Sequence, residues 1–228
     1  MSSCVIACSK VWRPIMDREV SRKTGWDCSL ITDPKHLTVS LLEGVSPEFV
    51  FFPHWSHKIP PEIFERWTCV VFHMTDLPYG RGGSPLQNLI ARGIKETKIC
   101  ALRCVAELDA GPVYLRRSLS LQGSAQDIYI AANAIIEDMI VEIIQHRPQA
   151  NPQTGSPTMF PRRTPQEGSI AQLRKLEETY DYIRMLDAAG YPPAFLETDA
   201  LRLEFSRARI SGDRIVADVT IRLKNDDK

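Results

Sequence analysis

The first 120 residues repeat short, almost entirely apolar runs, and this repetition constrains the fold more than any other feature. Strands that are apolar at nearly every position are covered on both faces, as in a parallel sheet flanked by helices. Several intervening segments open with a proline, which is favoured in the first turn of a helix. We therefore expect an α/β domain with a largely parallel sheet. The expected strands are 4–9, 28–32, 48–52, 69–73, 98–107 and 112–120, and the expected short helices are 34–42, 60–67 and 85–92.

A longer helix is expected from Ser124 to about His146, because Ser124 and Asp127 form a start resembling a capping box. Its apolar face is expected to pack on the sheet and to comprise Ile128, Ala131, Ile135, Met139 and Ile143.

Residues 148–165 are rich in proline and lack periodicity, which predicts a linker or an extended tether. A helix at 173–186 and two alternating segments around a turn at 211–213 then predict a small α+β domain. We divide the chain into a main domain at 1–148, a linker at 149–168 and a small C-terminal domain at 169–228.

Charge and composition favour a cytoplasmic protein. The 28 basic and 28 acidic residues balance, so the chain has no general attraction to nucleic acid. Neither a signal-peptide pattern nor an apolar run long enough to span a membrane is present, so no membrane partner is expected. The six cysteines lie mostly in apolar runs, which predicts reduced thiols and no disulfides.

The most informative stretch runs from Val70 to Gly93 and is followed by Asp109. In a parallel sheet, the strand ending at His73 and the next strand would deliver His73 and Asp109 to one edge, where such folds bind ligands. An imidazole beside a carboxylate suits acyl transfer to an amine. The turn at 81–85 feeds a helix whose amides would face an anionic group. Each of these features alone is more often structural, so the functional interpretation rests on their occurring together in this order.

Three motifs carry a family resemblance: HMTDLP at 73–78, RG at 81–82 and DAGP at 109–112. In this order they resemble the signature of the 10-formyltetrahydrofolate-dependent formyltransferases. Segments 160–165 and 191–195 resemble the linker and C-terminal domain of the sugar N-formyltransferases. The resemblance implies the formyltransferase fold, with a Rossmann-like sheet and a small α+β C-terminal domain. It also implies metal-free formyl transfer from the cosubstrate 10-formyltetrahydrofolate to an amine.

The sugar-enzyme resemblance implies a small-molecule acceptor, a nucleotide-linked deoxyamino sugar used for surface-glycan or nonulosonic-acid biosynthesis. The alternative acceptor is methionyl-tRNA. Residues 171–228 carry 10 Lys/Arg and 11 Asp/Glu, a net charge of about −1 that disfavours a tRNA-binding appendage. Homodimerisation through Leu201, Leu203 and Phe205 is a further expectation, and these residues otherwise cover the main domain.

One position departs from the family pattern. Members usually carry an asparagine two residues before the histidine, where its amide holds the formyl oxygen, and this chain has Val71. Loss of one such donor costs about a hundredfold to a thousandfold in turnover. His54 or Ser56 is expected to substitute as a catalytic group, with Thr75 or a backbone amide as further candidate donors. Alternatively, His54 and Ser56 merely cap a strand and cover the pterin. A catalytically silent folate-binding relative is the remaining alternative.

The resemblance also implies binding residues around His73 and Asp109. The folate is expected to contact Phe52, Pro53, Trp55, Ile59, Thr75, Leu77, Val105, Leu108 and Gly111. The acceptor is expected to contact Lys10, Arg13, Tyr79, Arg81, Gly82 and Gly83.

Overall fold

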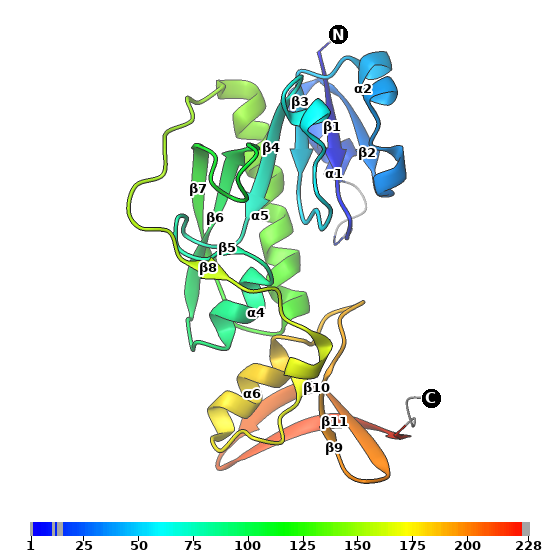
Figure 1. Ribbon diagram of the computed structural model, residues 1–228, viewed down its shortest axis with the longest axis vertical. Helices are drawn as coiled ribbons and strands as arrows, with labels where there is room; N and C mark the ends of the chain where they lie inside the picture. Colours follow the sequence, from blue (N-terminus) through cyan, green and yellow to red (C-terminus); the bar gives the residue numbers. More distant parts are fainter. Residues whose placement is uncertain (1, 11, 13–15, 225–228) are drawn as a thin grey trace. The chain divides into compact units, whose positions relative to one another are not determined.

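The computed structural model describes residues 2–10, 12 and 16–224 and contains two compact units (Figure 1). Unit 1 comprises Met1–Gly82, Thr97–Leu119 and Ile130–Met159. Unit 2 comprises Gly83–Glu96, Ser120–Tyr129 and Phe160–Lys228. The chain therefore passes between the units several times. The domain limits expected from the sequence form a simpler division and stay a prediction.

Unit 1 is built on a six-stranded sheet in the order β2-β1-β3-β4-β6-β7. Strands β2, β1, β3 and β4 are mutually parallel, so the expectation of a largely parallel sheet is confirmed, whereas β6 is antiparallel to β4. Strand β6 also ends four residues earlier than expected, where a loop begins. The strands are β1 (Ser3–Ala7), β2 (Asp27–Ile31), β3 (Phe49–Phe52), β4 (Thr68–His73), β6 (Glu96–Arg103) and β7 (Val113–Ser120).

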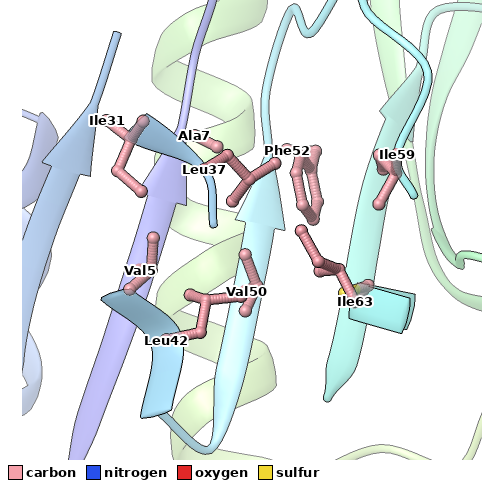
Figure 2. Packing of buried hydrophobic residues seen from close by; sticks show 10 residues of the cluster. Val5, Ala7, Ile31, Leu37, Leu42, Val50, Phe52, Ile59 and Ile63 are labelled. Atoms are coloured by element: carbon pink, nitrogen blue, oxygen red, sulfur yellow. The ribbon is translucent and has the colours of Figure 1, made fainter. Parts of the chain in front are cut away.

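Short helices cover the sheet face shown in Figure 2. The expected helix at 34–42 is split into η1 (Pro34–His36) and α2 (Val39–Val45), because the Thr38 side chain accepts a hydrogen bond from Leu41 N and caps α2. Leu42 of α2 and Ile63 of α3 (Pro61–Phe64) pack with Val5, Val50 and Phe52 in one buried cluster. Alternate strand residues therefore form the core on this face.

Of two further helices, the sequence missed one and predicted the other. Helix α1 (Met16–Thr24) was not expected, because only Met16 and Val20 of this charged segment are buried. Helix α5 (Ala125–His146) has the expected bounds, and Ser124 and Asp127 form the reciprocal capping hydrogen bonds. The prediction of the apolar face of α5 was partly wrong, because Ala131 is exposed and Ile135 is half-buried. The i, i+4 series Ile128, Ala132, Ile136 and Ile140 is buried instead.

Unit 2 contains α4 (Pro85–Ile90), η2 (Pro165–Gly168), α6 (Leu176–Arg184) and a sheet in the order β11-β10-β9. The two predicted C-terminal strands are confirmed as the antiparallel pair β10 (Leu201–Ser211) and β11 (Arg214–Leu223). Strand β9 (Ala194–Glu197) was not expected. Helix α6 is shorter than expected, and its Arg184 guanidinium donates to the carbonyls of Leu121 and Gly123.

The proline-rich segment is more ordered than a loose tether. Asn151 and Val113 exchange two backbone hydrogen bonds of 2.8 and 2.9 Å, and Arg81 N donates to Thr158 O. Strands β5 (Arg81–Gly82) and β8 (Met159–Phe160) pair at its far end. The segment therefore forms short β-pairs with the first residue of β7 and with the loop that follows β4. Among the described residues, no helix is long and apolar enough to cross a membrane.

Candidate active site

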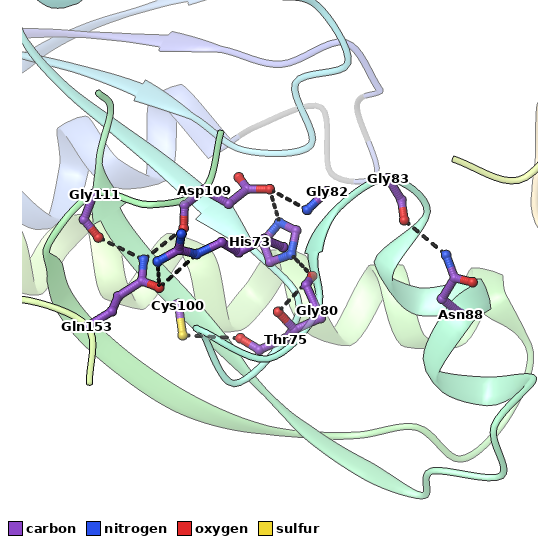
Figure 3. A network of polar contacts seen from close by, with 11 residues as sticks. His73, Thr75, Gly80, Gly82, Gly83, Asn88, Cys100, Asp109, Gly111 and Gln153 are labelled. Carbon is purple, nitrogen blue, oxygen red and sulfur yellow. Dashed lines mark hydrogen bonds and ion pairs between the residues drawn. The ribbon is translucent and has the colours of Figure 1, made fainter. Parts of the chain in front are cut away.

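His73, the last residue of β4, lies in a network of polar contacts and is almost completely buried (Figure 3). Its Nε2 lies 2.7 Å from Gly80 O, and its Nδ1 lies 3.4 Å from Asp109 Oδ2. A carbonyl oxygen only accepts hydrogen bonds, so Nε2 must carry a proton. In the neutral ring Nδ1 then has the lone pair, and it faces a carboxylate. The pair can therefore receive and stabilise a proton at Nδ1.

Asp109 reaches His73 by a route that the sequence did not predict. Because β6 is antiparallel to β4, its carboxyl end lies beside Val70, at the opposite end of β4 from His73. The loop after β6 brings Asp109 back, and Asp109 has a left-handed φ of 52°. Its Oδ2 accepts a 2.8 Å hydrogen bond from Gly82 N. The expected pair is thus brought together by a folded loop rather than by a shared strand edge.

Gly111 and Gln153 shape this loop. A Cβ on Gly111 would lie 1.8 Å from Arg103 O, so only glycine fits there. Gln153 Nε2 donates to the carbonyls of Asp109 and Gly111 at 2.7 and 2.9 Å, and Gln153 Oε1 accepts from the Arg81 guanidinium. Sequence reasoning missed Gln153, because nothing in an aperiodic, proline-rich segment indicates a side chain directed at residues 42 and 44 positions away.

Val71 points to the same sheet face as His73, two residues earlier on β4. It is paired with Phe52 on one side and Leu102 on the other, and it packs against two apolar clusters. No hydrogen-bond donor is therefore supplied at this position. Nearby, burial raises the pKa of the Cys104 thiol to about 11, with the charge of Asp109 adding to the effect. Cys104 is consequently a neutral thiol at neutral pH.

The loop after β3 begins beside Val71 and contains both expected substitute donors. His54 has a left-handed φ of 48°, and burial lowers the pKa of its imidazole to about 4, so it is neutral at neutral pH. Ser56 is exposed, and its backbone N–H donates to Ser9 Oγ. Trp55 packs edge-on against Phe52. The catalytic roles of His54 and Ser56 stay predictions.

The expected folate-contact residues fall into two groups. Val105 and Leu108 are exposed apolar side chains on the Asp109 loop, and Trp55 is partly exposed. Thr75 Oγ1 instead donates to Gly80 O, so this side chain holds the turn that supports His73. Thr75 is buried together with Phe52, Pro53, Ile59, Leu77 and Gly111.

The acceptor residues are only partly available for binding. Gly82 N donates to Asp109 and Gly83 N donates to Phe160 O, so neither amide faces an anionic ligand as the sequence suggested. Arg81 is buried, and its guanidinium contacts Gln153 and Glu107. Lys10 is partly exposed and Tyr79 is 38% exposed, whereas Arg13 lies outside the described residues.

Comparison with known proteins decides the family. A solved structure described as methionyl-tRNA formyltransferase from Clostridium thermocellum is 45% identical to this chain, with a TM-score of 0.95, over 98% of this chain and 100% of that one. The chain belongs to the formyltransferase family. It is therefore an enzyme of this family, and the implied formyltransferase fold is confirmed.

The relatives named next have lower sequence identity to this chain. A family model of the methionyl-tRNA formyltransferase C-terminal domain matches residues 165–222. The methionyl-tRNA formyltransferase of Thermodesulfovibrio yellowstonii is 22% identical over 82% of this chain. The chain spans 63% of the length of that curated relative and 29% of the Rickettsia prowazekii one. A sugar N-formyltransferase from Shewanella is 12% identical over 96% of both chains, with a TM-score of 0.67, so it shares the fold.

Proposed function

We propose that the protein transfers a formyl group from 10-formyltetrahydrofolate to the amino group of methionyl-tRNA. The 45% identity to the Clostridium thermocellum protein along nearly the whole chain carries this proposal. The matching C-terminal family model at 165–222 supports the same acceptor. The sequence motifs alone favoured a sugar acceptor, but the sugar N-formyltransferase named above is only 12% identical.

The residues around His73 support formyl transfer to an amine. When bound, 10-formyltetrahydrofolate supplies the electrophilic formyl carbon, which forms a bond to the acceptor nitrogen as the bond to the folate nitrogen breaks. His73 Nδ1 takes the proton that the acceptor amine loses, and Asp109 stabilises the resulting imidazolium. The same proton passes to the folate nitrogen that leaves, so His73 returns to its neutral form.

Side chains on the Asp109 loop and on the loop after β3 fit a folate. Val105 and Leu108 expose apolar surface on the loop that carries Asp109, and a flat pterin can cover such surface. Among the residues that the structure describes, Trp55 Nε1 is buried with no hydrogen-bond partner. A buried indole N–H normally donates to an acceptor, and a bound ligand with ring nitrogens and a carbonyl can provide one.

An amino sugar attached to a nucleotide is the second candidate acceptor, because several arginines in the described part of the C-terminal segment are paired with carboxylates. Arg202 pairs with Glu197 and Glu204, Arg222 pairs with Glu204, and Arg207 pairs with Asp218. A tRNA-binding surface normally presents unpaired basic side chains to phosphates.

The decisive experiment offers both acceptors to the purified protein with 10-formyltetrahydrofolate. The expected result is a gain of one formyl group on charged initiator methionyl-tRNA, measured by mass spectrometry, with an equal release of tetrahydrofolate. Formylation of a nucleotide-linked 4-amino sugar alone would replace the proposed acceptor. Binding of a folate analogue by calorimetry without transfer to either amine would identify a silent relative, as Val71 allows.

A further inference from the structure

The proline-rich segment from Asn151 to Thr158 connects the two loops that hold the His73–Asp109 pair. Asn151 is hydrogen-bonded to Val113 through both backbone groups. Thr158 N donates to Pro78 O, and Thr158 O accepts from Arg81 N. One loop supplies Gly80 O and Gly82 N to the pair, and the other carries Asp109 itself. Between these two backbone attachments lies Gln153.

The orientation of the Gln153 side-chain amide is determined by its four contacts. Nε2 lies 2.7 Å from Asp109 O and 2.9 Å from Gly111 O, and both of these atoms only accept hydrogen bonds. Oε1 lies 3.2 Å from Arg81 Nε and 2.9 Å from Arg81 Nη2, which only donate. Arg81 is itself held by Glu107 at 3.0 Å. Rotating the amide by half a turn would therefore break every contact.

These contacts act on a strained residue. Asp109 is not glycine, and its φ of 52° persists only where the surroundings enforce it. Gln153 holds the Asp109 carbonyl, and Gly82 holds the Asp109 carboxylate. Without the contact at the carbonyl, the Asp109 backbone can relax to a negative φ and carry the carboxylate away from His73 Nδ1.

We propose that Gln153 is a positioning residue of the active site, which fixes Asp109 toward His73 and makes the proline-rich segment part of the catalytic structure. The inference rests on the proposed formyl transfer for its kinetic effect. Its structural effect on the His73 ring is independent of any substrate.

Gln153→Glu is the sharpest test, because it preserves the shape of the side chain and the oxygen that faces Arg81. It replaces both N–H donors by an oxygen facing two carbonyls. Gln153→Met removes the same donors without adding a charge, and it keeps the test open if Gln153→Glu does not fold. Gln149→Glu is the matched control, because Gln149 is an exposed residue of the same segment.

Three measurements on the full chain separate positioning from a purely structural role. Both Gln153 variants should lower kcat by about tenfold to a hundredfold, as expected when a catalytic group is misplaced, and change the KM for 10-formyltetrahydrofolate less than threefold. The ring ¹⁵N resonances of His73, assigned by comparison with His73→Gln, should shift in both. Gln149→Glu should leave kcat and the resonances unchanged.

Retention of kcat within about twofold together with unchanged His73 resonances would overturn the proposal, even with a lowered Tm, since Gln153 would then be only structural. Failure of the wild-type protein to formylate either acceptor would refute the proposed function instead. In that case the His73 resonances of the variants still decide the positioning role: shifted resonances support it and unchanged ones reject it.

Discussion

Gly111→Ala tests how tightly the Asp109 loop must fold for the site to exist. A Cβ at this position would lie 1.8 Å from Arg103 O and 2.9 Å from Arg103 C. Both are backbone atoms, so no side-chain rotation relieves the contact. Separating the oxygen and the new carbon to 3.0 Å requires a backbone shift of about 1.2 Å, and a misplacement of about 1 Å can cost about a hundredfold in rate.

The shift also breaks two hydrogen bonds, from Arg103 N to Pro112 O and from Gln153 Nε2 to Gly111 O, each 2.9 Å long. At about 1 kcal/mol net each, the free energy of unfolding should fall by about 2 kcal/mol. For a chain of this size the Tm should then drop by about 4–8 °C.

The assay combines thermal denaturation by circular dichroism with the rate of tetrahydrofolate release. The control is Gly44→Ala in helix α2, where a Cβ meets nothing within 4 Å. That variant should be more stable by about 0.5–1 kcal/mol, because alanine restricts the unfolded chain. A Gly111→Ala protein with the Tm and kcat of the wild type would refute the account of the loop.

Three further outcomes follow from the site. Asp109→Asn removes the carboxylate charge beside His73 Nδ1 and should lower kcat by about a hundredfold to ten-thousandfold in the same assay. A loss under tenfold would contradict the role of Asp109 in stabilising the proton on His73. Val71→Asn adds an amide donor among apolar side chains, so the free energy of unfolding should fall by about 1–3 kcal/mol. Turnover should rise about tenfold because the new amide holds the formyl oxygen, and unchanged or lower turnover would mean that this oxygen is held elsewhere. Burial lowers the His54 pKa to about 4, so between about pH 6.5 and pH 4 the unfolded state binds a proton that the folded state does not bind. The free energy of unfolding should therefore fall as the pH is lowered from about 6.5 to about 4. Denaturation across this range should show a shallower loss for His54→Gln, and parallel curves for both proteins would contradict the assignment.

Local patterns in the sequence determined the main elements of the fold. Short runs rich in apolar residues predicted the six strands of the main sheet, and the inner strands β1 and β3 are buried throughout because they are covered on both faces. Ser124 and Asp127 predicted the start of α5, because a capping box depends only on residues three apart. The short motifs at 73–78, 81–82 and 109–112, taken in this order, predicted the family and that His73 and Asp109 lie together. Each of these signals is encoded within a few neighbouring residues.

Tertiary structure decided how the site is held together. The antiparallel direction of β6, the return of Asp109 to His73 and the contacts of Gln153 all depend on residues far apart in the sequence. A hydrogen bond between Gln153 and Asp109 joins positions 44 residues apart, and no local periodicity encodes it. The proline-rich segment looked like a tether because its partners are backbone carbonyls, which every residue carries and no sequence pattern distinguishes.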